Sequence, residues 1–245
     1  SGSFFNTSAE SFKVSVKLIL ERINNFRISK QYETEINRLK NLWEADVVRV
    51  TSKTDKNALP SDSEVIGAVN RNVPKDTIVI GAAGSMPGEL HKLWQSGDVE
   101  GYHMEYGFSC MGYEIPAAIG VNLAEPDRPN VIFVGDGSYM MMNSELSTAV
   151  MMGISTTIIV TDNRGFGCIN RLQKSTGSEP FNNLFKDSHH QRLPNIDYVL
   201  HAKSLGASAE KANSIEELED LVVKFINRKE VNVIVIDTDP DQSTE

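Results

Sequence analysis

Apolar residues along this 245-residue chain gather in short runs that alternate with amphipathic stretches. The apolar runs predict buried strands at residues 77–80, 131–134, 156–160, 207–210 and 231–236. The amphipathic stretches predict helices at residues 111–123, 143–152, 196–205 and 214–227. Strands that alternate with helices in this way form a doubly wound, mostly parallel sheet with helices on both faces. The pattern therefore predicts an α/β fold.

Two further amphipathic stretches, at residues 8–26 and 31–45, predict helices that precede this fold. The polar segment at residues 51–57 breaks the helical pattern and predicts a linker. We therefore divide the chain into a short helical segment, residues 1–57, and a main domain, residues 58–245.

Charge and cysteine usage limit the classes of partner and compartment. The chain has 24 basic and 33 acidic residues and a net charge of −9, which argues against nucleic acid and anionic membranes as partners. Two cysteines, Cys110 and Cys168, are too few for a disulfide framework and fit a reducing compartment. With no run of 18 apolar residues and no targeting segment, we expect a cytoplasmic protein without a membrane span.

The candidate chemistry lies where two predicted strands end. Gly135-Asp136-Gly137 follows one strand, and Asn163 follows the next strand along the chain. The glycines permit a sharp turn, Asp136 supplies a negative charge, and Asn163 and the carbonyl of Gly165 supply further oxygen ligands. Mg²⁺ prefers such ligands and is usually held by one or two carboxylates and by phosphate groups. The arrangement predicts Mg²⁺ that clamps a diphosphate, although Gly-Asp-Gly alone is also what a turn contains.

These residues resemble the signature of thiamine diphosphate-dependent enzymes, in which a Gly-Asp-Gly motif precedes a metal-binding Asn at this spacing. The family often has Asn where this chain has Asp162, at a position that does not bind the metal. The resemblance implies that Asp136, Asn163 and the Gly165 carbonyl bind Mg²⁺. It implies contacts to thiamine diphosphate from Gly84, Ser85, Ser109, Met111, Gly137, Ser138 and Asn163.

The implied contacts differ in what each residue supplies. The hydroxyl of Ser85 and the amides of its glycine loop would hold phosphate oxygens, although a plain strand-to-helix turn has the same residues. In the family, the backbone of Gly137 and Ser138 also contacts the diphosphate. Met111 matches the large apolar residue that bends the cofactor into a V, although methionine is more often a core residue. The Ser109 carbonyl would accept a hydrogen bond from the 4′-amino group.

Three longer segments carry a closer resemblance, at residues 82–94, 103–114 and 162–170. They resemble the trihydroxycyclohexane-1,2-dione hydrolases, thiamine enzymes that open a small cyclic dione to 5-deoxy-glucuronic acid in myo-inositol catabolism. This implies hydrolysis of a C–C bond in a ketonic substrate. The alternatives are an acetolactate synthase-like or decarboxylase thiamine enzyme, and a non-catalytic oligomerisation module.

The resemblance also implies that the chain is part of a longer enzyme. Residues 1–57 match the end of the family's middle domain and its linker, where some relatives bind FAD. The glutamate that activates thiamine belongs to the family's N-terminal domain, so no catalytic residue is expected in this chain, and the isolated chain is expected to be inactive. Because the family binds its cofactor between subunits, we expect a homodimer or homotetramer.

Overall fold

The computed structural model describes residues 9–23, 26–52, 55, 57–105 and 107–242, and the chain divides into two compact units, Ser1–Ala45 and Asp46–Glu245. Helix α1 (Ala9–Arg22) and most of helix α2 (Lys30–Val50) form the first unit, as the helical pattern predicted. Their apolar side chains are exposed; Leu20, Leu39 and Trp43 are each more than half exposed. The assignment of residues 1–57 to a middle domain stays a prediction.

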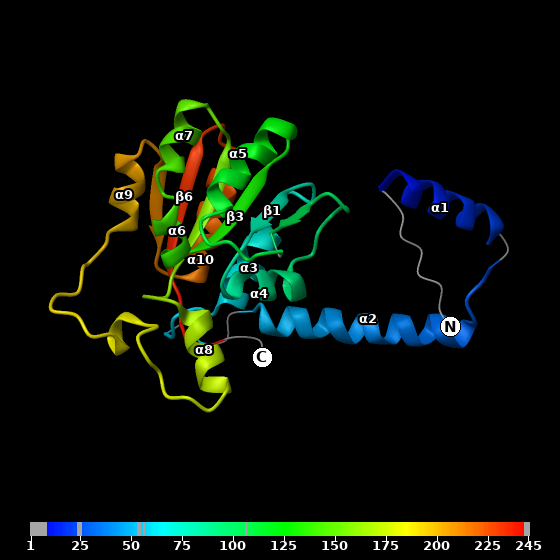
Figure 1. Ribbon diagram of the computed structural model, residues 1–245, viewed down its shortest axis with the longest axis horizontal. Coiled ribbons are helices and arrows are strands. Elements are labelled where there is room, and N and C mark those ends of the chain that lie inside the picture. Colours follow the sequence, from blue (N-terminus) through cyan, green and yellow to red (C-terminus); the bar gives the residue numbers. More distant parts are fainter. Residues whose placement is uncertain (1–8, 24–25, 53–54, 56, 106, 243–245) are drawn as a thin grey trace. The chain divides into compact units, whose positions relative to one another are not determined.

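The second unit is built on a six-stranded parallel sheet with the strand order β2-β1-β3-β4-β6-β5 (Figure 1). Its strands are β1 (Ile78–Gly81), β2 (Tyr102–Met104), β3 (Asn130–Gly135), β4 (Thr156–Asp162), β5 (Ser208–Ala212) and β6 (Val231–Asp237). The five predicted strands are confirmed. Strands β3 and β4 are direct neighbours, with Gly135 opposite Thr161.

Helices cover both faces of this sheet (Figure 1). They are α3 (Asp62–Asn72), α4 (Ser85–Leu93), α5 (Glu114–Ala124), α6 (Asp136–Met141), α7 (Glu145–Met151), α8 (Gly167–Ser175), α9 (Tyr198–Ser204) and α10 (Ile215–Phe225). Successive strand residues point to opposite faces. Phe133 therefore packs with α3, α4 and α10, whereas Ile132 and Val134 pack with α5, α7 and α9. The predicted doubly wound α/β fold is confirmed.

Several elements were not predicted, and one prediction was wrong. Strand β2 has only three residues, α4 contains Pro87 and Gly88 near its start, and α8 follows a glycine-rich loop. The sequence predicted a sharp glycine turn around Asp136, but Asp136 begins helix α6 directly after β3. Gly135 has an ordinary extended backbone (φ −73°, ψ 158°), because the chain passes from strand to helix without a left-handed residue.

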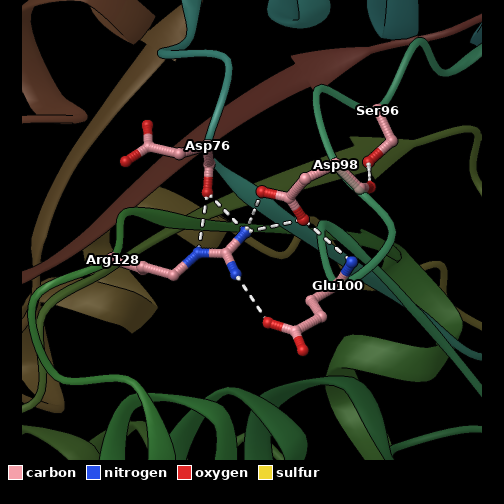
Figure 2. A network of polar contacts seen from close by, with 5 residues as sticks. All are labelled: Asp76, Ser96, Asp98, Glu100 and Arg128. Atoms are coloured by element: carbon pink, nitrogen blue, oxygen red, sulfur yellow. Dashed lines mark hydrogen bonds and ion pairs between the residues drawn. The ribbon is translucent and has the colours of Figure 1, made fainter.

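A network around Arg128 ties together the loops at the amino ends of β1 and β3 (Figure 2). The Arg128 guanidinium donates to the Asp76 carbonyl at 2.9 and 3.0 Å and lies 3.0 Å from the Asp98 carboxylate. Glu100 lies 3.8 Å from Nη1 of the same guanidinium. Asp98 also accepts from the Glu100 amide at 2.8 Å, and Ser96 donates to the Asp98 carbonyl at 2.7 Å. This network links the loops at the amino ends of the strands, at the opposite end of the sheet from the candidate site.

Among the helices of the described residues, none combines the length and the apolar character that a membrane crossing requires.

Candidate functional site

Asp136 and Asn163 lie side by side because their strands are neighbours in the sheet. Asp136 directly follows β3 and Asn163 directly follows β4, which pair in parallel. Both side chains are buried, with 2% and 9% of the residue exposed. Both line the same cavity at the carboxyl edge of the sheet. The sequence prediction that the two residues meet at this edge is confirmed.

The oxygens of these two side chains are only partly satisfied. Oδ2 of Asp136 accepts a hydrogen bond from the Gly165 amide at 3.0 Å, which orients the carboxylate. Oδ1 of Asp136 and Oδ1 of Asn163 are buried and have no hydrogen-bond partner. Buried polar atoms are normally paired, so two unpaired oxygens in one cavity fit the ligand set of a cation. A hard ion such as Mg²⁺ suits one carboxylate, one amide oxygen and further oxygens from a phosphate.

No group of three or more His, Cys, Asp or Glu side chains gathers around a common point within the part of the chain that the structure describes. A cation at Asp136 and Asn163 would thus have at most two carboxylates from the described residues around it. This is the ligand pattern of Mg²⁺ sites that share the ion with a phosphate, and it differs from an all-protein metal cage.

Electrostatics favour a positive charge beside Asp136. Burial, and secondarily the nearby carboxylate of Asp162, raises the pKa of Asp136 from 3.8 to about 7. Burial also raises the pKa of Asp162. A divalent cation beside Asp136 would oppose both effects and favour the ionised form of the two carboxylates.

All the residues for which the sequence predicted a role line one cavity of about 180 Å³. They are Gly84, Ser85, Ser109, Met111, Asp136, Gly137, Ser138, Asn163 and Gly165. The chain also contributes Phe166, Cys168 and Ile169 from the start of α8, which the sequence did not predict. The structure brings the predicted residues together, and their individual roles stay predictions.

Two glycines in the cavity wall permit close contacts. A Cβ at Gly137 would lie 2.7 Å from the Phe166 ring and 3.6 Å from Cε of Met111. A Cβ at Gly165 would lie 2.5 Å from the Asn183 carbonyl oxygen, and its φ of +145° is outside the range of other residues. Gly137 therefore lets an aromatic ring close one wall, and Gly165 lets the loop that donates to Asp136 cross a neighbouring segment.

Asp162, the residue that departs from the family pattern, holds this loop. Its Oδ1 accepts from the Arg164 amide at 3.1 Å, and its Oδ2 lies 3.5 Å from the Arg164 guanidinium. Arg164 has a left-handed backbone with φ of +61°. This side chain-to-backbone hydrogen bond helps to fix the turn that carries Asn163 and Gly165.

The hydroxyls of Ser85 and Ser138 both form hydrogen bonds with buried carboxylates. Ser85, on which the sequence prediction relied for a phosphate contact, donates its hydroxyl proton to Asp62 at the start of α3. Ser138 donates to Glu114 at 2.9 Å and accepts from the Gly112 amide at 2.8 Å. As the structure has them, the hydroxyl protons point away from the cavity. The backbone amides of Ser85 and Ser138, each in the first turn of a helix, can instead donate to an anion.

Glu105, in the segment 103–114 that carries the closer resemblance, organises the loop that brings Ser109 to the cavity, a role that the sequence did not predict. Its carboxylate accepts from the backbone amides of Phe108 at 2.8 Å and Cys110 at 2.9 Å. These bonds lower the pKa of Glu105. Ser109 has a φ of +50°, so the loop is tightly turned. No spacing in the sequence indicates that this carboxylate accepts from the two amides.

Comparison with known proteins agrees with this site. Residues 82–236, well over half of the chain, match the family model described as "Thiamine pyrophosphate enzyme, C-terminal TPP binding domain". A relative from Clostridium tetani (strain Massachusetts / E88), named 3D-(3,5/4)-trihydroxycyclohexane-1,2-dione hydrolase, is 37% identical over 235 residues. The match covers 84% of this chain and 36% of that relative. A protein of the same name from Bacillus subtilis (strain 168) is 37% identical over 218 residues, covering 89% and 33%. The chain thus spans about a third of the length of these relatives.

Two solved structures share the fold. The 4-hydroxybenzoylformate decarboxylase of Rhodococcus jostii RHA1, described as thiamine diphosphate-dependent, superimposes with a TM-score of 0.67 at 22% identity, covering 78% of this chain and 35% of its own. The benzoylformate decarboxylase of Polynucleobacter necessarius gives a TM-score of 0.65 at 20% identity, covering 79% and 36%. The family match, together with the cavity at the carboxyl edge of the sheet, shows that the chain belongs to the thiamine pyrophosphate enzymes and contains their C-terminal cofactor-binding domain.

Proposed function

We propose that the chain is the cofactor-binding part of a thiamine diphosphate-dependent hydrolase that opens trihydroxycyclohexane-1,2-dione to 5-deoxy-glucuronic acid in myo-inositol catabolism. The names of the relatives that are 37% identical support the substrate and the reaction type. The orphaned, buried oxygens of Asp136 and Asn163 in one cavity carry the proposal of a Mg²⁺–diphosphate site.

Asp136 and Asn163, with the carbonyl of Gly165, would hold Mg²⁺. The backbone amides at Ser85 and Ser138 would hold the diphosphate, because amide donors suit phosphate oxygens. The Gly165 amide keeps the Asp136 carboxylate oriented before the ion arrives, through the 3.0 Å hydrogen bond to Oδ2. Preorganised ligands bind an ion without the cost of ordering them first.

When bound, thiamine diphosphate supplies a carbon nucleophile and an electron sink for breaking a C–C bond next to a carbonyl. In our proposal Met111 supports the bent cofactor from below, and the Ser109 carbonyl accepts a hydrogen bond from its amino group. The Phe166 ring, packed against Gly137, keeps bulk water from that wall of the cavity. These residues bind and orient the cofactor, and the glutamate that activates it would come from another domain.

A decarboxylase is the second candidate because both structural neighbours are decarboxylases. Their identities of 20% and 22% support the fold alone, whereas the hydrolase names come with 37% identity over most of this chain. We therefore favour the hydrolase. The longer polypeptide to which we assign this chain should hydrolyse the cyclic dione and leave 2-keto acids intact. Carbon dioxide release from benzoylformate without dione hydrolysis would reverse that preference.

The proposal includes a cytoplasmic homodimer or homotetramer. The exposed apolar side chains of α1 and α2 support association, because apolar surface of this kind is usually covered by a partner. Light scattering should give at least twice the mass of the 27.1 kDa chain, and a monomer at high protein concentration would count against it. The comparisons lend no support to FAD, and flavin is not part of the proposal.

Isothermal titration tests the cofactor site directly in the 245-residue chain. Thiamine diphosphate with Mg²⁺ should bind the unaltered chain, and Asp136→Ala should abolish the Mg²⁺-dependent part of the affinity. Asp127→Asn, a substitution on an exposed residue outside the cavity, is the matched control and should bind normally. Equal Mg²⁺-dependent affinity in the Asp136→Ala and unaltered chains would refute the site.

A further inference from the structure

A buried carboxylate stands directly behind the diphosphate end of the cavity. Asp62, the first residue of α3, is 2% exposed and does not line the cavity. Ser85, the first residue of α4, does line it and donates its hydroxyl proton to Oδ2 of Asp62. Ser85 therefore lies between Asp62 and the place where we propose the diphosphate.

The direction of this hydrogen bond conflicts with anion binding. A hydroxyl has one proton, so a serine that donates to an ionised carboxylate turns its lone pairs toward other neighbours. Lone pairs facing a diphosphate repel it. If Asp62 carries a proton, the carboxyl group becomes the donor, Ser85 accepts, and the Ser85 proton is free to point into the cavity.

Taken together, the surroundings of Asp62 favour its protonated form. Burial raises the pKa of Asp62, and the carboxylates of Glu89 on α4 and Asp239 on the C-terminal segment act in the same direction. The hydroxyl of Ser85 and the guanidinium of Arg171, whose Nη2 is 4.0 Å from Oδ2, favour the ionised form. Arg171 is held by the Pro240 carbonyl at 2.7 Å, so its charge is shared.

The second oxygen of the Asp62 carboxyl group also favours the neutral form. Oδ1 of Asp62 is buried and has no hydrogen-bond partner. An unpaired oxygen is costly in a charged carboxylate, which spreads its charge over both oxygens, and less costly in a neutral carboxyl group. The site therefore accommodates neutral Asp62 without any movement of its neighbours.

We propose that Asp62 is a proton-linked positioning residue, which takes up one proton when a diphosphate binds and thereby turns the Ser85 hydroxyl toward the anion. The proton comes from solvent and ends on Oδ2 of Asp62. Oδ2 then donates to Oγ of Ser85, and Ser85 donates to a phosphate oxygen. The anion itself also disfavours a negative charge on Asp62, so both effects act in one direction. The inference rests on the proposed function, because it needs a diphosphate in this cavity.

Isothermal titration in buffers of different ionisation enthalpy measures the protons exchanged on binding. The 245-residue chain is first saturated with Mg²⁺, so that Asp136 is already ionised, and thiamine diphosphate is then added. The unaltered chain should take up more protons, by as much as one per site, than Asp62→Asn. Its affinity should fall by as much as tenfold for each unit of rising pH above the pKa of free Asp62, because one proton is linked to binding. Asp62→Asn, whose amide can donate to Ser85 at every pH, should show a flatter profile.

Ser85 supplies the matched pair of control variants. Ser85→Thr keeps the hydroxyl and should keep the proton uptake, whereas Ser85→Ala should reduce it. This pair also decides the question if Asp62→Asn fails to fold. Equal proton uptake by the unaltered chain and Asp62→Asn, or by Ser85→Thr and Ser85→Ala, would overturn the inference while leaving the cofactor site intact. Absence of binding in every variant would instead refute the proposed function, and the inference with it.

Discussion

Asp136 should lower the stability of the metal-free protein above about pH 7, and its replacement by asparagine should raise the stability there. Asparagine has nearly the same shape and can still accept from the Gly165 amide, but it carries no charge. The native protein holds Asp136 in a buried place where its pKa is about 7, against 3.8 for the unperturbed group. Between those two values, the native state binds a proton that the unfolded state has lost.

The sign and size of the effect follow from this difference. Because the native state binds more protons, rising pH destabilises it, from about pH 4 until the native carboxyl has ionised near pH 7. The shift of about 3 units corresponds to about 4 kcal/mol of lost stability at the end of this range. An unpaired asparagine amide costs about 1–3 kcal/mol in return. The net gain of Asp136→Asn at about pH 8 should therefore be about 1–3 kcal/mol. Near pH 4 only the cost of the unpaired amide remains, so the variant should there be less stable than the unaltered chain by about 1–3 kcal/mol.

Urea unfolding followed by circular dichroism, with a chelator present, measures this difference between Asp136→Asn and the unaltered chain across the pH range. Asp127→Asn, on an exposed residue, controls for the removal of one negative charge. Added Mg²⁺ should stabilise the unaltered chain and leave Asp136→Asn unchanged, because only a ligand that binds the native state adds stability. A difference that is constant with pH, or one that favours the unaltered chain at high pH, would refute the reasoning.

Three other substitutions test separate parts of the structure. Gly165→Ala would set a Cβ 2.5 Å from the Asn183 carbonyl oxygen at a φ of +145°, and should lower the free energy of unfolding in urea by about 2–4 kcal/mol. The control Gly153→Ala, with a φ of +66° and open space around the new Cβ, should cost only about 1 kcal/mol. Equal costs for the two variants would contradict this prediction. Arg128→Ala removes the network of Figure 2 and should lower the free energy of unfolding by about 1–3 kcal/mol. The affinity for thiamine diphosphate, measured by titration, should not change. A large loss of affinity would show that the amino and carboxyl ends of the sheet are coupled. Gly137→Ala would bring a Cβ within 2.7 Å of the Phe166 ring, which is 42% exposed and can therefore move aside. We expect a stability change under about 1 kcal/mol and weaker cofactor binding. Unchanged affinity would show that this part of the cavity wall does not contact the cofactor.

The apolar pattern determined most of the fold before the structure was known. Parallel strands buried on both faces read as continuous apolar runs, such as the one that became β3, and these are the least ambiguous signal in a sequence. The pairing of Asp136 with Asn163 could also be predicted, because residues that follow neighbouring parallel strands meet at one edge. Elements that depend on tertiary contacts were missed, including three-residue β2 and the proline-containing α4.

The sequence by itself determined which residues surround the site, but only the tertiary structure decided how their polar atoms are used. A motif records residue types and spacing, whereas a hydrogen bond depends on groups brought together from distant positions. Ser85 was predicted to bind phosphate through its hydroxyl, yet that hydroxyl donates its hydrogen bond to Asp62, 23 positions earlier. Oδ1 of Asp136 is left without a partner because burial in the folded chain removes water from it. The fold, and not the motif, leaves this oxygen available to the cation that we propose.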